Sequence, residues 1–91
     1  MLEFRWNEDK NVQLKHERGV SFENVVAAVT EGRVFEVRNH PNQERYPNQN
    51  IYIVQIESYV YIVPYVSTDY GAFLKTIIPS RKETKKHLYN D

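Results

Sequence analysis

Residues 51–66 have the sequence IYIVQIESYVYIVPYV, in which two apolar runs are separated by Glu57-Ser58. Both runs are rich in β-branched and aromatic residues, as is typical of strands, and the two-residue connection predicts an antiparallel hairpin. Both runs are apolar on both faces, so we expect these strands at the centre of a sheet. Pro64 has no amide hydrogen to give to a neighbouring strand, so we expect a bulge or a strand break there.

Outside this hairpin, the pattern predicts further strands over residues 2–6, 34–37 and 73–78. Capping and stop residues predict helices from about Glu8 to Arg18, from Ser21 to Gly32, and from Ser80 to about Leu88. Residues 39–50 are polar and contain two prolines, so they are expected to form a loop. The predicted fold class is α+β: one twisted, mostly antiparallel sheet of about five strands, with two N-terminal helices and a short C-terminal helix.

The two N-terminal helices differ in their apolar content. The first is mostly polar, with Val12 and Leu14 as its clear apolar residues, so we expect a surface helix held along one side. In the second, apolar residues fall at i, i+3, i+4 and i+7, which predicts one stripe packed on the sheet. The residues of this stripe are Phe22, Val25, Val26 and Val29.

Length and composition limit the classes of protein that this chain can belong to. Ninety-one residues make one small domain, residues 1–91, which is too short for a doubly wound cofactor-binding sheet. The chain has no cysteine, which excludes disulfides and thiolate metal sites and fits a reducing cytoplasm. Its longest apolar run, residues 59–66, is far below the roughly 20 residues of a membrane span, and no secretory signal is visible in residues 1–5.

Charge is balanced over the whole chain but not along it. Twelve Lys and Arg residues face twelve Asp and Glu residues, so the net charge is zero. The segment from Lys75 to His87 nevertheless holds five basic residues and a single acid, Glu83. Such a run is most often a solvated helix face, but it also predicts a local basic patch that could bind an anionic partner.

The sequence contains no recognised motif of catalysis or cofactor binding. None of the three histidines is part of a pair at metal-ligand spacing, and there is no glycine-rich phosphate loop and no nucleophile elbow. We therefore predict no metal site and no cofactor. The remaining candidates are the basic residues, the loop pair Glu44-Arg45 and Tyr89 near the carboxyl end.

A set of short motifs, in order along nearly the whole chain, points to a family. They are Phe4-x-Trp6, Lys10, Gly19-Val20-Ser21-Phe22-Glu23, Glu44-Arg45, Ile77-Ile78-x-x-Arg81-Lys82-x-Thr84 and Tyr89. In these residues the chain resembles the BrnT-type toxins of bacterial toxin–antitoxin pairs. The resemblance implies a RelE-like fold, ribonuclease activity on mRNA, and a neutralising antitoxin that itself binds DNA.

The chain departs from the family pattern in four places, one of which is Thr76, where the family commonly has an arginine before the two isoleucines. Trp6 is followed by Asn7 instead of aspartate, and Pro79-Ser80 stands where the family has Ser-Ala. The Lys-His pair that precedes the family's Gly-Val-Ser-Phe is replaced by Glu17-Arg18, with His16 two residues early. A catalytic histidine is therefore not carried over by position.

We thus expect a metal-independent endoribonuclease toxin of a type II pair. Arg45 and Arg81 are the candidate phosphate clamp, Glu44 a base or a partner of Arg45, and Tyr89 a group that hydrogen-bonds phosphate or stacks on a base. The candidate RNA-backbone contacts are Lys10, Arg18, Lys82, Lys85 and Lys86. Expected partners are mRNA and a cognate antitoxin, with DNA reached only through that antitoxin and no membrane.

Two alternatives remain open at this stage. One is a non-catalytic protein of the same fold that binds the antitoxin and co-represses transcription, which the missing histidine and the neutral charge favour. The other is a small structural protein unrelated to toxins.

Overall fold

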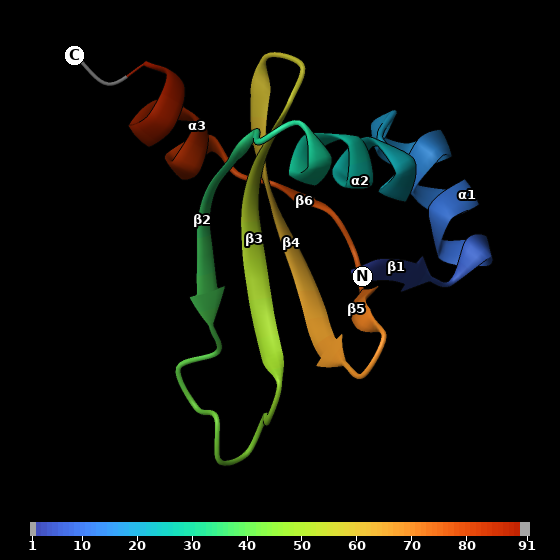
Figure 1. Cartoon of the computed structure of the whole chain (residues 1–91). Coiled ribbons are helices and arrows are strands. Elements are labelled where there is room, and N and C mark those ends of the chain that lie inside the picture. The colour runs from blue at the N-terminus through green and yellow to red at the C-terminus, as the bar shows by residue number, and fades with distance from the viewer. Residues whose placement is uncertain (1, 90–91) are drawn as a thin grey trace.

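The computed structural model describes residues 2–89, which form six strands and three helices (Figure 1). In chain order these are β1 (Glu3–Trp6), α1 (Glu8–Arg18), α2 (Phe22–Thr30), β2 (Val34–Asn39), β3 (Gln49–Ile56), β4 (Tyr59–Thr68), β5 (Gly71–Leu74), β6 (Ile78–Pro79) and α3 (Arg81–Leu88).

All described strands belong to one sheet with the order β1-β5-β4-β3-β2, and β6 also pairs with β4. The hairpin β3–β4 lies at the centre, as its two-sided apolar sequence predicts, and Glu57 takes a left-handed conformation in its turn. The β1–β5 pair is parallel and every other pair is antiparallel. The α+β class and the mostly antiparallel sheet are therefore confirmed.

The ends of α1 and α2 are set by the capping residues that the sequence indicates. Asn7 accepts a hydrogen bond from the amide of Lys10 at 3.0 Å, and Gly19 stops the helix at φ 67°. Ser21 and Asn24 form a reciprocal capping box at the start of α2. These local signals are strong because each satisfies backbone groups that a helix end leaves unpaired.

The main core lies between α1, α2 and one face of the sheet. Leu14, Phe22, Val25 and Ala28 are fully buried from the helix side, and Trp6 stacks on Phe22 with ring centroids 5.6 Å apart. Val26 and Val29 are only partly buried, so the buried face of α2 is centred on Val25 and includes Ala28. The sheet contributes to this core Tyr52, Val54, Ile56, Val63, Tyr65, Ala72 and Leu74.

The predicted bulge or break at Pro64 is wrong, because β4 is continuous and Pro64 pairs in register with Ile51. The Pro64 carbonyl accepts the amide of Lys75 at 2.8 Å, so its nitrogen faces the same edge, away from β3. On that edge β5 ends at Leu74 and β6 begins at Ile78. The position where Pro64 lacks an N–H group therefore lies opposite the gap between β5 and β6. No hydrogen bond between paired strands is lost.

The predicted strand over residues 73–78 is divided at the same gap. Ile77 leaves the sheet and becomes fully buried in the main core, which turns the chain out of the strand. The Arg18 guanidinium donates to the Ile77 carbonyl, so the end of α1 holds this segment in place.

The last helix, α3, packs on β4 near the β3–β4 turn (Figure 1). Ser80 caps it by accepting from the Glu83 amide at 3.1 Å, and its own amide donates to the Val60 carbonyl at 3.0 Å. The capping box that the sequence predicts is thus half formed, because Val60 already satisfies the amide that the Glu83 carboxylate would accept. This frees Glu83 to point elsewhere.

Candidate functional site

The loop residues Glu44 and Arg45 lie apart from α3. Both are exposed in the segment between β2 and β3, and no ion pair joins them within residues 2–89. Arg45 instead holds its guanidinium over the ring of Tyr46, 5.4 Å from the centroid. The expectation that Glu44 orients Arg45 is therefore not met in this structure.

The loop and α3 are attached to opposite ends of β4. Asn48, at the end of the loop, accepts from the amide of Ser67, whereas α3 begins where Ser80 donates to Val60. The stretch of β4 between these two attachments spans about 20 Å at the usual rise of a strand. Arg45 and Arg81 are consequently not brought to one place, and a single phosphate cannot be clamped by both.

The predicted residues that do lie together are on α3. Arg81, Lys82 and Lys85 are exposed, and none forms an ion pair with the rest of the described chain. Lys86 contacts Glu36 at 3.5 Å. Tyr89 follows the helix with 67% of its surface exposed, free to contact a ligand.

The two predicted RNA contacts on α1 have different surroundings. The Arg18 guanidinium donates a hydrogen bond to the Ile77 carbonyl, so it joins the end of α1 to the segment that follows β5. Lys10 is half-buried, and its ammonium group makes no ion pair within residues 2–89.

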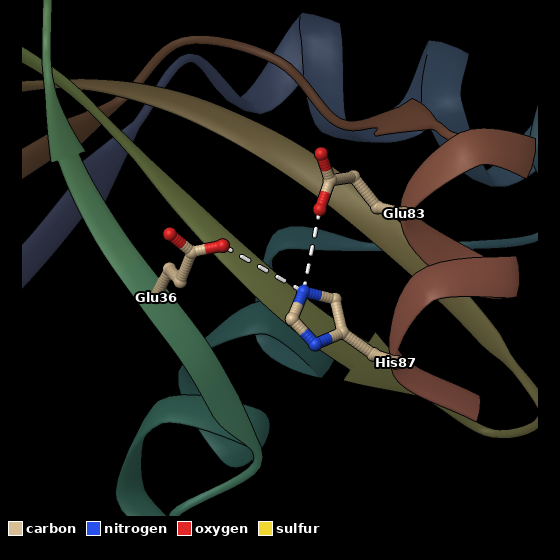
Figure 2. Close-up of side chains that lie close together, drawn as sticks. All are labelled: Glu36, Glu83 and His87. Carbon is tan, nitrogen blue, oxygen red and sulfur yellow. Dashed lines mark ion pairs between the residues drawn. The ribbon is translucent and has the colours of Figure 1, made fainter. Parts of the chain in front are cut away.

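A cluster that the sequence motifs do not indicate joins α3 to the edge strand β2. Figure 2 shows Glu83 and His87 projecting from α3 toward Glu36 of β2. His87 Nε2 lies 3.3 Å from Glu83 Oε1 and 3.7 Å from Glu36 Oε2. Glu83 and His87 are four residues apart on the helix and so share one face.

The backbone of β2 explains how two consecutive residues contact one imidazole. The register of β2 against β3 shifts between Val34 and Glu36, so Phe35 is an extra residue on this edge strand. A bulge of this kind redirects side chains. Phe35 stacks on the His87 ring with centroids 4.3 Å apart and an interplanar angle of 10°, while Glu36 faces its Nε2 atom.

Arg38 bonds to both carboxylates of the cluster. Its Nε and Nη2 atoms donate to the two oxygens of Glu36 at 3.1 and 2.6 Å, and Nη1 donates to Glu83 at 3.4 Å. The hydrogen bonds from Arg38, with a smaller contribution from Lys86, lower the pKa of Glu36 to about 2. The same bonds to Glu36 raise the pKa of Arg38. Both groups therefore stay charged across the physiological range.

The two nitrogens of His87 differ in what they face. Nε2 is buried and is the one buried side-chain nitrogen or oxygen of residues 2–89 without a hydrogen-bond partner, since the nearby carboxylates lie at ion-pair distance but are not aligned. Nδ1 points away from both carboxylates in Figure 2. Nδ1 also makes no hydrogen bond within residues 2–89, and the His87 side chain as a whole is 15% exposed.

Glu36, Glu83 and His87 are spaced closely enough to bind a divalent cation, with one ligand atom from each within 4.8 Å of the others. The charges around this cluster do not favour a divalent cation. Two carboxylates are already matched by Arg38 and Lys86, so a divalent ion would add two uncompensated charges. We therefore assign no metal ion to this place.

Sequence reasoning missed this cluster for a physical reason. The i, i+4 spacing of Glu83 and His87 was available as a signal once the helix was predicted. Their meeting with Glu36 and Arg38 depends on the position of α3 over β2, which no local pattern contains.

None of the helices within residues 2–89 is long and apolar enough to cross a membrane. No family model, no curated protein and no solved structure matches this chain.

Proposed function

We propose that this protein is the toxin of a type II toxin–antitoxin pair and that it cleaves mRNA in the cytoplasm without a metal ion. The observation that carries the proposal is the set of exposed cations on α3. Arg81, Lys82 and Lys85 have no counter-ion within the described chain, although the protein as a whole is neutral. Unpaired cations concentrated on one short helix are suited to a phosphate backbone.

The reaction needs few groups. The ribose 2′-hydroxyl attacks the adjacent phosphorus. The protein must bind the phosphoryl oxygens and assist removal of the proton from the 2′-hydroxyl. Arg81 is placed to hold the phosphate, because a guanidinium offers two parallel donors. Lys82, Lys85 and Lys86 extend the positive surface along the helix, and Tyr89 lies beyond its end. Since Glu44 and Arg45 are attached at the other end of β4, we leave them outside the site.

The cognate antitoxin is the proposed protein partner. An acidic or apolar segment of the antitoxin that covered residues 81–86 would occlude RNA. Contact with DNA would then arise only through the antitoxin. The antitoxin should co-purify with this protein when the two are expressed together.

A second candidate function is a non-catalytic antitoxin-binding co-repressor of the same fold. It is favoured by a sheet face that α3 covers only in part, where Ile78 is 40% exposed. Apolar surface of this kind favours a protein partner over a nucleic acid. The half-buried apolar residues that continue this face are Ile51, Ile62, Pro64, Val66 and Phe73.

Induced expression separates the two functions. The chain is expressed alone and together with the product of a neighbouring short reading frame, while growth and mRNA integrity are followed. Growth arrest with mRNA cleavage, relieved by co-expression, supports the toxin. A harmless chain that is inert on purified RNA but forms a stable complex with the neighbour supports the co-repressor. A chain that does neither contradicts both.

A further inference from the structure

We propose that strand β2 is an interface for a second copy of this chain, and that two copies pair along it as an antiparallel dimer centred on Val37. The pairing joins the two sheets into one continuous sheet. This inference does not depend on the proposed ribonuclease function, because it follows from the edge of the sheet alone.

The first observation is that β2 is an open edge. It is the last strand in the sheet order and pairs only with β3 (Figure 1). The register continues to His40, whose amide donates to the Gln49 carbonyl at 2.8 Å. Because bonded and non-bonded pairs alternate in an antiparallel ladder, Arg38 also bonds to β3, and the backbone groups of Val37 and Asn39 point outward. No residue of 2–89 hydrogen-bonds these outward groups, and such an edge is a template for another strand.

An apolar side chain lies at the middle of this edge. Val37 is 57% exposed, and it shares a face of the sheet with its partner Tyr52. In a dimer centred on Val37, the two valine residues exchange N–H···O bonds and their side chains lie next to each other. Pairing therefore removes exposed apolar surface from water and satisfies backbone groups at the same place.

The charges of β2 favour one register. Glu36 and Arg38 flank Val37 on the opposite face, and pairing about Val37 places Glu36 of each copy opposite Arg38 of the other. The four charges then alternate in sign, as a two-fold interface requires. Centring on Arg38 would place two guanidiniums opposite each other, and centring on Asn39 would place Glu36 opposite Asn42, beyond the end of β2. Within one chain Arg38 bonds to Glu36, which holds both side chains in this row.

Helix α3 does not occupy this edge. It packs on β4 and reaches β2 through the side chains of Phe35, Glu36 and Arg38. Val37 and Asn39, whose backbone groups form the open edge, are both exposed. The two-fold axis of the dimer is perpendicular to the sheet, so α3 of both copies lies on the same face of the joined sheet.

The other open edge, β1, is less suited to pairing. It has four residues against six in β2, and α1 begins two residues after its end. Its residue Phe4 already packs on the main core, so pairing there would bury little new apolar surface. In β2 the bulge at Phe35 limits the regular part of the edge to residues 36–39. An interface this short is smaller than the roughly 1,200 Å² of a stable complex, so the dimer should dissociate on dilution.

The first test uses the absence of cysteine from the chain. Val37→Cys places one thiol per chain at the axis, where the Cα atoms of a bonded pair are about 5.5 Å apart, within the range of a disulfide. Mild oxidation should therefore give covalent dimers. Asn39→Cys is the matched control, because residue 39 is exposed on the same edge and face but lies about 14 Å from its own counterpart. It should stay uncrosslinked.

The second test is analytical ultracentrifugation from micromolar to millimolar concentration. The parent chain should show a monomer–dimer equilibrium. Val37→Glu sets two carboxylates opposite each other and should stay monomeric over the whole range, with its melting temperature unchanged at low concentration. Val12→Glu is the control, since Val12 is 52% exposed on α1, and it should dimerise as the parent does.

Three results would overturn the proposal. One is a parent chain that stays monomeric at every concentration. Another is a dimer that Val37→Glu leaves intact, since the interface would then lie elsewhere. The third is crosslinking of Asn39→Cys as fast as Val37→Cys, which would show random collision or another register. None of these results bears on RNA cleavage, so the proposed function is judged separately.

Discussion

The side-chain oxygen of Asn11, on α1, accepts a hydrogen bond from the backbone amide of Phe22, on α2, at 2.8 Å. Both groups are buried, and the Asn11 amide nitrogen donates in turn to Glu8 and to Glu23 at 3.0 and 2.8 Å. The bond to Asn11 lowers the pKa of Glu23. A polar residue in a mostly polar helix thus fixes the angle between the two helices.

Replacing Asn11 with alanine should destabilise the fold by about 1–3 kcal/mol, because the Phe22 amide would stay buried without a partner. Gln13→Ala is the matched control, since Gln13 is exposed on the same helix and bonds only to Glu17. Urea denaturation of the two variants measures the difference. Equal stabilities would show that water replaces the lost acceptor.

The two apolar residues of α1 should differ sharply when truncated. Leu14 is fully buried and Val12 is 52% exposed. Leu14→Ala should therefore cost about 2–5 kcal/mol through lost burial and a cavity, and Val12→Ala should stay within about 0.5 kcal/mol. Thermal unfolding of both variants tests the orientation of the helix, and a larger loss from Val12 would mean that α1 is rotated about its axis.

The sequence predicts what is encoded locally and fails where two distant segments meet. Helix ends at Asn7, Gly19 and Ser21 are predicted because each cap acts within its own turn. The continuous strand through Pro64 is not predicted, because it depends on where β5 ends and β6 begins. The parallel pairing of β1 with β5 also lies beyond local pattern, since Glu3 and its partner Gly71 are far apart in the sequence.

The candidate site divides in the same way. The run of basic residues in the sequence predicts the cations of α3, because one helix keeps them together. The pairing of Glu44 with Arg45 was not met, because adjacent loop residues need not point toward each other. The sequence marks His87 only as the last residue of the basic segment that begins at Lys75. Its contacts with Glu36 and Phe35 arise from a bulge in β2 and the position of α3.

Acid should weaken the link between β2 and α3. The pKa of Glu36 is about 2 in the folded chain against 4.5 ordinarily, so between these values the unfolded chain binds more protons than the folded one. The stability from Glu36 is therefore present above about pH 4.5 and is lost as the pH falls toward 2. Glu36→Gln should be less stable than the parent at pH 7, with a difference that shrinks as the pH falls.

Urea denaturation at pH 7, 4 and 3 measures this difference. Glu44→Gln is the control, because Glu44 is an exposed loop carboxylate without an ion pair within residues 2–89. Its stability difference from the parent should stay small at every pH. A difference for Glu36→Gln that is the same at pH 7 and pH 3 would rule out the linkage.

Gly71 should tolerate no side chain. A Cβ atom there would lie 2.4 Å from the carbonyl oxygen and 2.6 Å from the amide nitrogen of Glu3, its partner in the parallel β1–β5 pair. Gly71→Ala should cost about 3 kcal/mol through overlap and strain at φ 145°. Gly32→Ala, at φ 78° with no atom within 4 Å of the added Cβ, should cost about 1 kcal/mol. Denaturation curves with equal midpoints for the two variants would mean that β1 moves aside easily.

Arg81 is the residue whose loss should affect activity without affecting the fold. It is the first residue of α3, exposed and without an ion pair in the described chain, at a place where helix amides already favour an anion. A charge-assisted contact that strengthens in the transition state contributes about 3 kcal/mol, roughly a hundredfold in rate. Arg81→Ala should therefore abolish RNA cleavage and growth arrest while the melting temperature stays unchanged.

The conservative variant makes this prediction specific to the guanidinium. Arg81→Lys keeps the charge but offers no bidentate clamp, so it should recover little activity. Arg45→Ala is the matched control, because Arg45 is also exposed but is attached at the opposite end of β4. If Arg45→Ala abolishes cleavage and Arg81→Ala does not, the phosphate is held at the loop. If Arg81→Lys matches the parent in cleavage rate at equal expression, a general positive potential along α3 explains the activity and no clamp is required.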